Sequence, residues 1–228
     1  MTAVLDRYDQ VMVDDQAWSA LRAASRESFG VVSTEQAADF GVTVDALVDA
    51  ALADQVWKTP DGLWVIEDVG IFHIEDWAAA WLAIDLHTPI SQRRTNPESI
   101  ISHQSAAMIR NLGTITTDFL IVTSPHTLTA APAIIRHTVG EVGLHGQDWD
   151  LVDGLPVASP ARIVADLAAA DGVDGSHLGT VLATIVDEQL LTVDEVGELL
   201  RPHLHRWSQH PELGPGYVID LLVNSAYG

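Results

Sequence analysis

The order of apolar and polar positions over residues 31–68 predicts a helix, a tight turn, a second helix and a two-stranded hairpin. Ser33 and Gln36 have the three-residue spacing of a capping box, which marks a helix start. Gly41 allows the left-handed backbone that ends a helix, and Thr43 can cap the next one. With a leading helix over about 15–25, this order is that of a winged helix-turn-helix.

The hairpin is expected from two short apolar runs that flank a turn. Val56 to Lys58 lead into Thr59-Pro60-Asp61-Gly62, a sequence typical of turns, and Leu63 to Glu67 form the returning strand. The alternative interpretation, two unrelated amphipathic helices followed by a hairpin, remains open at this point.

The second helix has an apolar stripe, which we expect to face the core: Val44, Leu47, Val48, Ala51 and Leu52. Its outward face is then Ala46, Asp49, Ala50 and Ala53, flanked by Asp45. Small residues and carboxylates cannot make the bidentate contacts that read base edges, and DNA phosphates repel carboxylates. The alternative is that these aspartates are only a solvated face.

The remaining chain predicts strands followed by helices, which is typical of an α+β domain. Strands are expected at 118–123, 133–139 and 147–152, and helices at 75–86, 103–112, 159–170 and 177–189. Thr192 and Glu195 form another capping box. The polar segment 88–97 is the expected domain boundary, so the predicted domains are 1–88 and 97–228. Its Arg93-Arg94 pair is interpreted as an exposed loop, with contact to an acidic ligand as the alternative.

Composition narrows the classes of partner. The net charge is −21 with a single lysine, a field that disfavours nucleic acid and anionic membranes and attracts basic proteins. The chain has no cysteine, which excludes disulfides and thiolate chemistry. The N-terminus shows no apolar signal core, and no run reaches spanning length. We therefore expect a cytoplasmic protein without a membrane partner.

Candidate catalytic and metal sites are weak. His103, Gln104 and Ser105 lack the glycine frame of a nucleophilic serine, and a capping Ser102 beside a surface His103 explains them more simply. His203, His205 and His210 are better interpreted as an exposed loop than as a zinc site. We expect neither catalysis, nor a metal, nor a cofactor.

Three stretches together resemble the AbiEi-type antitoxins of abortive-infection (type IV) toxin–antitoxin systems. They are VVSTEQAADFGVTVDALVDAAL (31–52) with the hairpin strand GLWVIED (62–68), then ISHQSAAMIRNLG (101–113) and DGLPVASPARIVADLA (153–168). The residues that match the family motifs are Ser102, His103, Ser105, Ala106, Pro156, Ser159, Pro160, Arg162 and Asp166. The acidic second helix departs from the family, whose recognition helix is usually rich in arginine.

The resemblance implies an intracellular bacterial phage-defence protein. Its N-terminal winged helix would bind operator DNA as an autorepressor, and its C-terminal domain would counter a nucleotidyltransferase-like toxin. We expect a non-enzymatic antitoxin that binds the toxin through its acidic surface. The alternative is a DNA-binding transcriptional autorepressor, a homodimer that uses Arg22, Arg26, Ser33, Thr34, Thr43 and Lys58. A third reading makes the winged helix a protein-docking surface, with Ala46, Ala50 and Ala53 as its flat patch.

Overall fold

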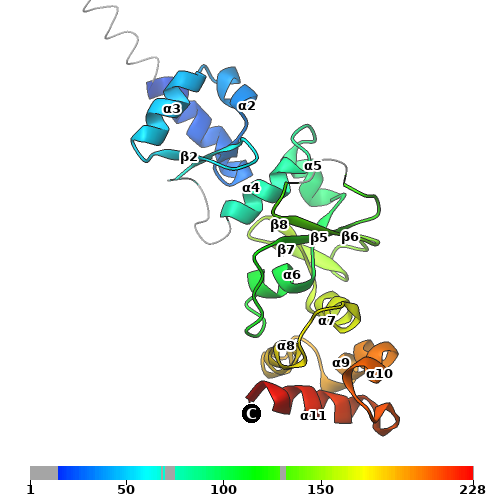
Figure 1. Cartoon of the computed structure of the whole chain (residues 1–228). Helices are drawn as coiled ribbons and strands as arrows, with labels where there is room; N and C mark the ends of the chain where they lie inside the picture. The colour runs from blue at the N-terminus through cyan, green and yellow to red at the C-terminus, as the bar shows by residue number, and fades with distance from the viewer. Residues whose placement is uncertain (1–14, 68, 70–74, 129–131, 228) are drawn as a thin grey trace, which may run out of the picture. The chain divides into compact units, whose positions relative to one another are not determined.

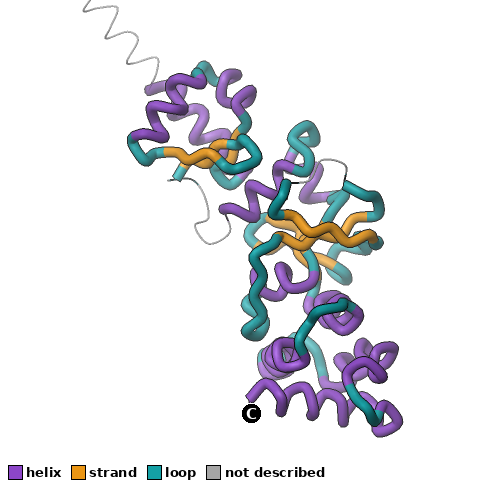
Figure 2. Tube along the Cα trace, in the orientation of Figure 1, coloured by secondary structure: helices purple, strands orange, loops and turns teal. Residues whose placement is uncertain are grey.

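The computed structural model describes residues 15–67, 69, 75–128 and 132–227, and the chain forms a mixed α+β structure (Figure 1). It divides into two compact units: the main division along the chain falls between Ser91 and Gln92, and Pro132 also belongs to unit 1. Each unit has its own β-sheet, as the separate groups of strands in Figure 2 show.

The first described elements of unit 1 are a helix over 15–25 and the 3₁₀ turn η1 (Arg26–Ser28). Its three-stranded antiparallel sheet has the order β1-β3-β2. The strands are β1 (Val31–Val32), β2 (Val56–Lys58) and β3 (Trp64–Ile66), and the helices α2 (Thr34–Asp39) and α3 (Val44–Leu52) lie between β1 and β2 in sequence. Helix α4 (Glu75–Ala83) follows and contacts β1.

The predicted start and stop signals of these helices are confirmed. The Ser33 hydroxyl accepts from the Gln36 amide, and the Gln36 side chain accepts from the Ser33 amide, which completes the capping box of α2. Gly41 has φ +83° after the helix ends. The Thr43 hydroxyl accepts from the Ala46 amide and caps α3.

The predicted orientation of α3 is wrong in part. Leu47 is buried and Ala51 packs against the core, as predicted, but Val44, Val48 and Leu52 are exposed, and Ala50, which was expected on the outward face, is buried. The packing of the core explains why α3 is rotated away from its predicted orientation. Leu47 fills the space between the surrounding core residues, and the small side chain of Ala50 allows close packing. These core residues include Leu21, Val32, Val56, Trp64 and Ile66.

Unit 2 is built on a five-stranded mixed sheet with the order β6-β5-β4-β8-β7. The strands are β4 (Ile100–Ile101), β5 (Leu120–Ser124), β6 (Ile135–Val139), β7 (Trp149–Val152) and β8 (Leu155–Ala158). Strands β4 and β8 are parallel with Ile101 opposite Val157. The sequence did not predict these two central strands.

Two helices of unit 2 begin almost immediately after a strand along the chain. Helix α6 (His103–Ile109) comes directly after β4, and α7 (Pro160–Ala169) comes directly after β8. The C-terminal part contains α8 (Gly175–Asp187), α9 (Val193–Leu200), η2 (Arg201–His203), α10 (Leu204–Trp207), η3 (Pro211–Leu213) and α11 (Gly214–Tyr227). Helices α8 and α11 lie side by side (Figure 1).

Other predicted elements need correction. The expected helix 75–86 ends at Ala83, and α6 ends at Ile109 rather than at 112. The segment interpreted as a boundary loop contains α5 (Ile90–Thr95), in which Arg93 is buried and the Arg94 Nε donates to the Gly154 carbonyl at 2.9 Å. The exposed-loop interpretation of this arginine pair is therefore wrong.

Candidate functional site

The two sequence motifs of unit 2 meet at one edge of its sheet. Because β4 and β8 are parallel neighbours, the residues that follow them emerge at the same end of the sheet. Ser102 therefore begins α6 close to where Ser159 begins α7, and the two helices contact each other. This places Ser102 and His103 near Arg162 and Asp166, about sixty residues away along the chain.

The prediction that the Ser102 side chain caps α6 is wrong, because this side chain makes no capping hydrogen bond. Its hydroxyl is fully buried, accepts a hydrogen bond from the Thr123 hydroxyl at 2.9 Å and lies 2.9 Å from His103 Nδ1. If Ser102 donates to an unprotonated Nδ1, all three groups are satisfied. Ser102 thus joins β5 to the first residue of α6.

His103 is not on the surface, because only 13% of its side chain is exposed. Its backbone has φ +53°, in the left-handed region that non-glycine residues rarely adopt. Burial lowers the pKa of its imidazole and outweighs the Asp166 carboxylate, which raises that pKa, while Arg162 lowers it further. We therefore assign a neutral imidazole at pH 7.

Asp166 pairs with Arg162 and lies close to His103. The Arg162 Nε donates to Asp166 Oδ1 at 2.8 Å, and the two side chains are only 19% and 13% exposed. The pair is thus largely buried, not the surface pair expected from its spacing. A further Arg162 nitrogen donates to the Glu141 carbonyl at 3.1 Å. The second carboxylate oxygen lies 3.8 Å from His103 Nδ1, too far for a hydrogen bond.

These residue types resemble a serine–histidine–aspartate triad, but the geometry differs. In a triad the serine and the carboxylate engage opposite nitrogens of the imidazole. Here both Ser102 and Asp166 approach Nδ1, and the Ser102 hydroxyl is fully buried. The arrangement therefore suits a structural role. We call the cluster of Ser102, His103, Thr123, Arg162 and Asp166 the polar lock: its hydrogen bonds join α6 to β5 and pair Arg162 with Asp166 on α7.

The other motif residues also hold the backbone together. The Ser105 hydroxyl donates to the Phe119 carbonyl and accepts from the Ile121 amide, both at 2.8 Å. Pro156 is buried in β8, Ser159 caps α7 and Pro160 occupies its first turn. Arg110 was not predicted from the sequence, and its side chain donates to the carbonyls of Val157 and Ala158.

Several exposed cations of the described residues are engaged within the chain. The exposed ones are Arg26, Lys58, Arg136, Arg201 and Arg206. The Arg136 guanidinium lies 3.7 Å from the centre of the Phe119 ring. Arg201 pairs with Glu198, and Arg206 pairs with Asp171. Most described carboxylates, by contrast, are exposed, so the charge that unit 1 and unit 2 present to solvent is mainly negative.

The residues expected to contact DNA come from several elements of unit 1, and Thr34 and Lys58 both contact Trp64. The hydroxyls of Ser33 and Thr43 cap helices, and the Thr34 hydroxyl accepts from Trp64 Nε1 at 3.2 Å. The Lys58 ammonium lies 5.1 Å from the centre of the Trp64 ring. Arg22 is half-buried and Arg26 is exposed at η1. None of these side chains belongs to α3.

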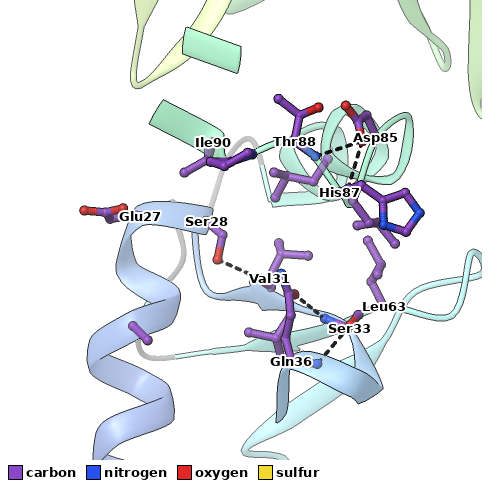
Figure 3. A pocket seen from close by; sticks show the side chains of 15 residues that line it. Glu27, Ser28, Val31, Ser33, Gln36, Leu63, Asp85, His87, Thr88 and Ile90 are labelled. Carbon is purple, nitrogen blue, oxygen red and sulfur yellow. Dashed lines mark hydrogen bonds between the residues drawn. The ribbon is translucent and has the colours of Figure 1, made fainter. Parts of the chain in front are cut away.

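A cavity of about 270 Å³ lies within unit 1 (Figure 3). Two of its polar wall residues hydrogen-bond to nearby backbone. Ser28 donates to the Val31 carbonyl at 2.7 Å, and Asp85 accepts from the amides of His87 and Thr88.

Two further findings concern the described residues alone. No group of three or more histidine or acidic side chains is placed to hold a metal ion, and the His210 Nδ1 lies 3.2 Å from a Glu212 carboxylate oxygen instead. No helix in the described ranges combines the length and apolar character needed to cross a membrane.

No known protein-family model matches the sequence, and no curated protein matches it. Among solved structures, the chain is similar to the Rv2827c protein from Mycobacterium tuberculosis, with 16% sequence identity and a TM-score of 0.48. The similarity covers 92% of this chain and 81% of that one.

Proposed function

We propose that this protein is an antitoxin that binds and neutralises a nucleotidyltransferase-type toxin through its acidic surface. The observation that carries the proposal is the mainly negative surface, on which Arg136, Arg201 and Arg206 are held by neighbouring side chains. The resemblance of the three motif stretches to AbiEi-type antitoxins supports it.

The physical argument starts from what such a toxin must present. An enzyme that handles nucleotides or RNA needs a basic cleft for phosphates. A partner with net charge −21 can fill that cleft in place of the nucleic acid. Complementary fields also speed association and make the affinity fall as salt rises.

We propose that unit 1 is a winged helix-turn-helix, with α3 as its second helix and the β2–β3 hairpin as its wing. This fold favours the second candidate function, a DNA-binding autorepressor. Its α3, however, exposes Asp45 and Asp49 and carries no cation, so the usual source of DNA affinity is missing there. In a gel shift with the promoter DNA upstream of its own gene, we expect weak or no binding at physiological salt.

The test of the antitoxin function is co-expression with the product of the adjacent gene. We expect that product to be a nucleotidyltransferase-like protein that stops growth alone, and we expect growth to return when this chain is present. Purified together, the two proteins should elute as one complex in size-exclusion chromatography.

A variant in which the negative charge is lowered at exposed positions, such as Asp187→Lys with Glu188→Lys, tests whether the overall charge or a local contact drives the binding. An adjacent gene of another class, or growth arrest that persists with no complex, contradicts the proposal.

A further inference from the structure

The exposed face of α3 carries a row of apolar side chains. Val44, Val48 and Leu52 are 51%, 44% and 81% exposed, which is unusual for three successive positions on one helix face. Within the described residues, the core of unit 1 packs against the opposite face, through Leu47 and Ala50. The apolar pattern of the sequence predicted that this row is buried.

Val44, Val48 and Leu52 are each four residues apart, so their side chains form a continuous row. Residues four apart lie one above the other on a helix, about 6 Å apart along the axis. The three side chains therefore form a strip of about 12 Å. Such a strip is the counterpart of the i, i+4 anchors by which amphipathic helices pack together.

Carboxylates border this row on one side. At 100° per residue, Asp45 and Asp49 lie next to Val48 and Leu52, on the side away from Ala51, and both are exposed. Asp54 follows the C-terminus of α3, where the helix dipole is negative. Helices α2 and α3 contain no lysine or arginine. The face thus combines an apolar strip with a negative border.

We propose that this face of α3 docks an amphipathic helix of another protein, one whose apolar side chains are flanked by lysine or arginine. The apolar strip supplies the buried contact, and the border of Asp45 and Asp49 fixes the orientation by charge. The inference goes beyond the proposed function, because it assigns a contact to unit 1 whichever protein supplies the helix.

Other occupants match the face less well. A second copy would bring Asp45 and Asp49 against the same carboxylates, which repel. Duplex DNA would meet carboxylates and aliphatic groups where it needs hydrogen-bond donors. Residues 1–14 carry three aspartates and one arginine, so their charge does not complement the face.

The test uses two fluorescein-labelled peptides of identical composition, made of leucine and lysine. In one the leucines form a single helical face, and in the other their order is scrambled so that no face forms. Binding to the full chain is measured by fluorescence polarisation at 150 mM salt. We expect the amphipathic peptide to bind at least about tenfold more tightly than its isomer.

Variants locate the contact. Val48→Asp and the double variant Asp45→Lys, Asp49→Lys should each weaken binding of the amphipathic peptide by about tenfold or more. Val193→Asp is the matched control for Val48→Asp, because Val193 is 48% exposed at the start of α9. Asp187→Lys with Glu188→Lys controls for the change in net charge. Both controls should stay within about twofold of the parent chain.

Hydrogen exchange gives an independent location, since the bound peptide should protect amides of residues 44–53. Circular dichroism checks that every variant is folded. Equal affinity for the two peptides, an unchanged affinity in Val48→Asp, or an equal loss in Val193→Asp overturns the proposal. A sedimentation shift of the parent chain to a dimer that Val48→Asp abolishes assigns the face to a second copy and overturns it as well.

Discussion

His103 shows how a residue's role depends on neighbours that its local sequence does not contain. The local sequence Ser102-His103-Gln104 suggested a helix cap beside a surface histidine. In the structure, Thr123 on β5 and Asp166 on α7 lie beside these residues, and together they belong to the buried polar lock. The antiparallel pairing of β4 with β5 brings Thr123 to Ser102, and the parallel pairing of β4 with β8 brings α7 with Asp166 beside α6. No spacing in the sequence encodes these pairings.

Asp166→Asn tests the lock at its carboxylate. The substitution removes the charge that pairs with the largely buried Arg162, so we expect the free energy of unfolding to fall by about 2 kcal/mol. For a chain of this size, that corresponds to a Tm lower by roughly 4–8 °C. Urea and thermal denaturation measure both quantities.

The control is Asp171→Asn, which removes the exposed partner of Arg206. Exposed ion pairs contribute little, so its denaturation curve should overlay that of the parent chain. Equal effects of the two substitutions would show that burial of the Arg162–Asp166 pair is irrelevant.

The pH dependence of stability tests the environment of His103. Burial holds its pKa in the folded chain below the usual 6.5. As the pH falls through 6.5, the unfolded chain therefore takes up a proton at this histidine before the folded chain does, and stability decreases.

We expect the parent chain to lose more stability than His103→Gln between pH 7 and pH 5. The difference between the two chains, measured by urea denaturation, cancels the contributions of the other titratable groups. If His103→Gln loses as much or more over this range, the folded chain does not disfavour the charged imidazole.

At the scale of elements, helix positions were easier to predict than helix faces. The caps Ser33, Thr43, Ser159 and Thr192 all accept hydrogen bonds from the expected helix starts. The face of α3 was mispredicted because alanine fits either side of a helix. Leu47 borders both the sector of Val44, Val48 and Leu52 and a sector of alanines, and the core packs against the alanine side.

The central strands β4 and β8 were missed for local reasons. Strand β4 has two residues, too few to show an alternating pattern. Strand β8 contains Pro156, which argues against a central strand. It is tolerated because the pairing of β8 with the short β4 is registered only at Val157.

The packing of α8 against α11 gives a prediction at this scale. A methyl group added at Gly179 would collide with the Leu222 carbonyl of α11. Although alanine favours helices, we expect Gly179→Ala to reduce the free energy of unfolding by about 1–3 kcal/mol, because the two helices must move apart.

Gly216→Ala is the matched control on α11, where the added methyl group meets no atom within 4 Å. There the higher helix propensity of alanine should act alone and raise stability by up to about 1 kcal/mol. Chemical denaturation compares the two variants, and a neutral Gly179→Ala would contradict the tight α8–α11 contact.

At the scale of the whole molecule, the charge presented to solvent depends on where the cations lie as well as on their number. Arg94, Arg110 and Arg162 direct their guanidinium groups to backbone carbonyls of unit 2, so they stabilise the fold. The negative charge could be predicted from composition alone. The use of the arginines within the chain could not, since it depends on the carbonyls that the fold brings close to them.

The central claim is that this negative surface binds a cationic protein. The most direct measurement is a calorimetric titration of the chain into the purified product of the adjacent gene at several salt concentrations. We predict a complex whose Kd rises at least about tenfold between 50 and 300 mM salt. No heat of binding at the lowest salt, or an affinity that salt leaves unchanged, would contradict the claim.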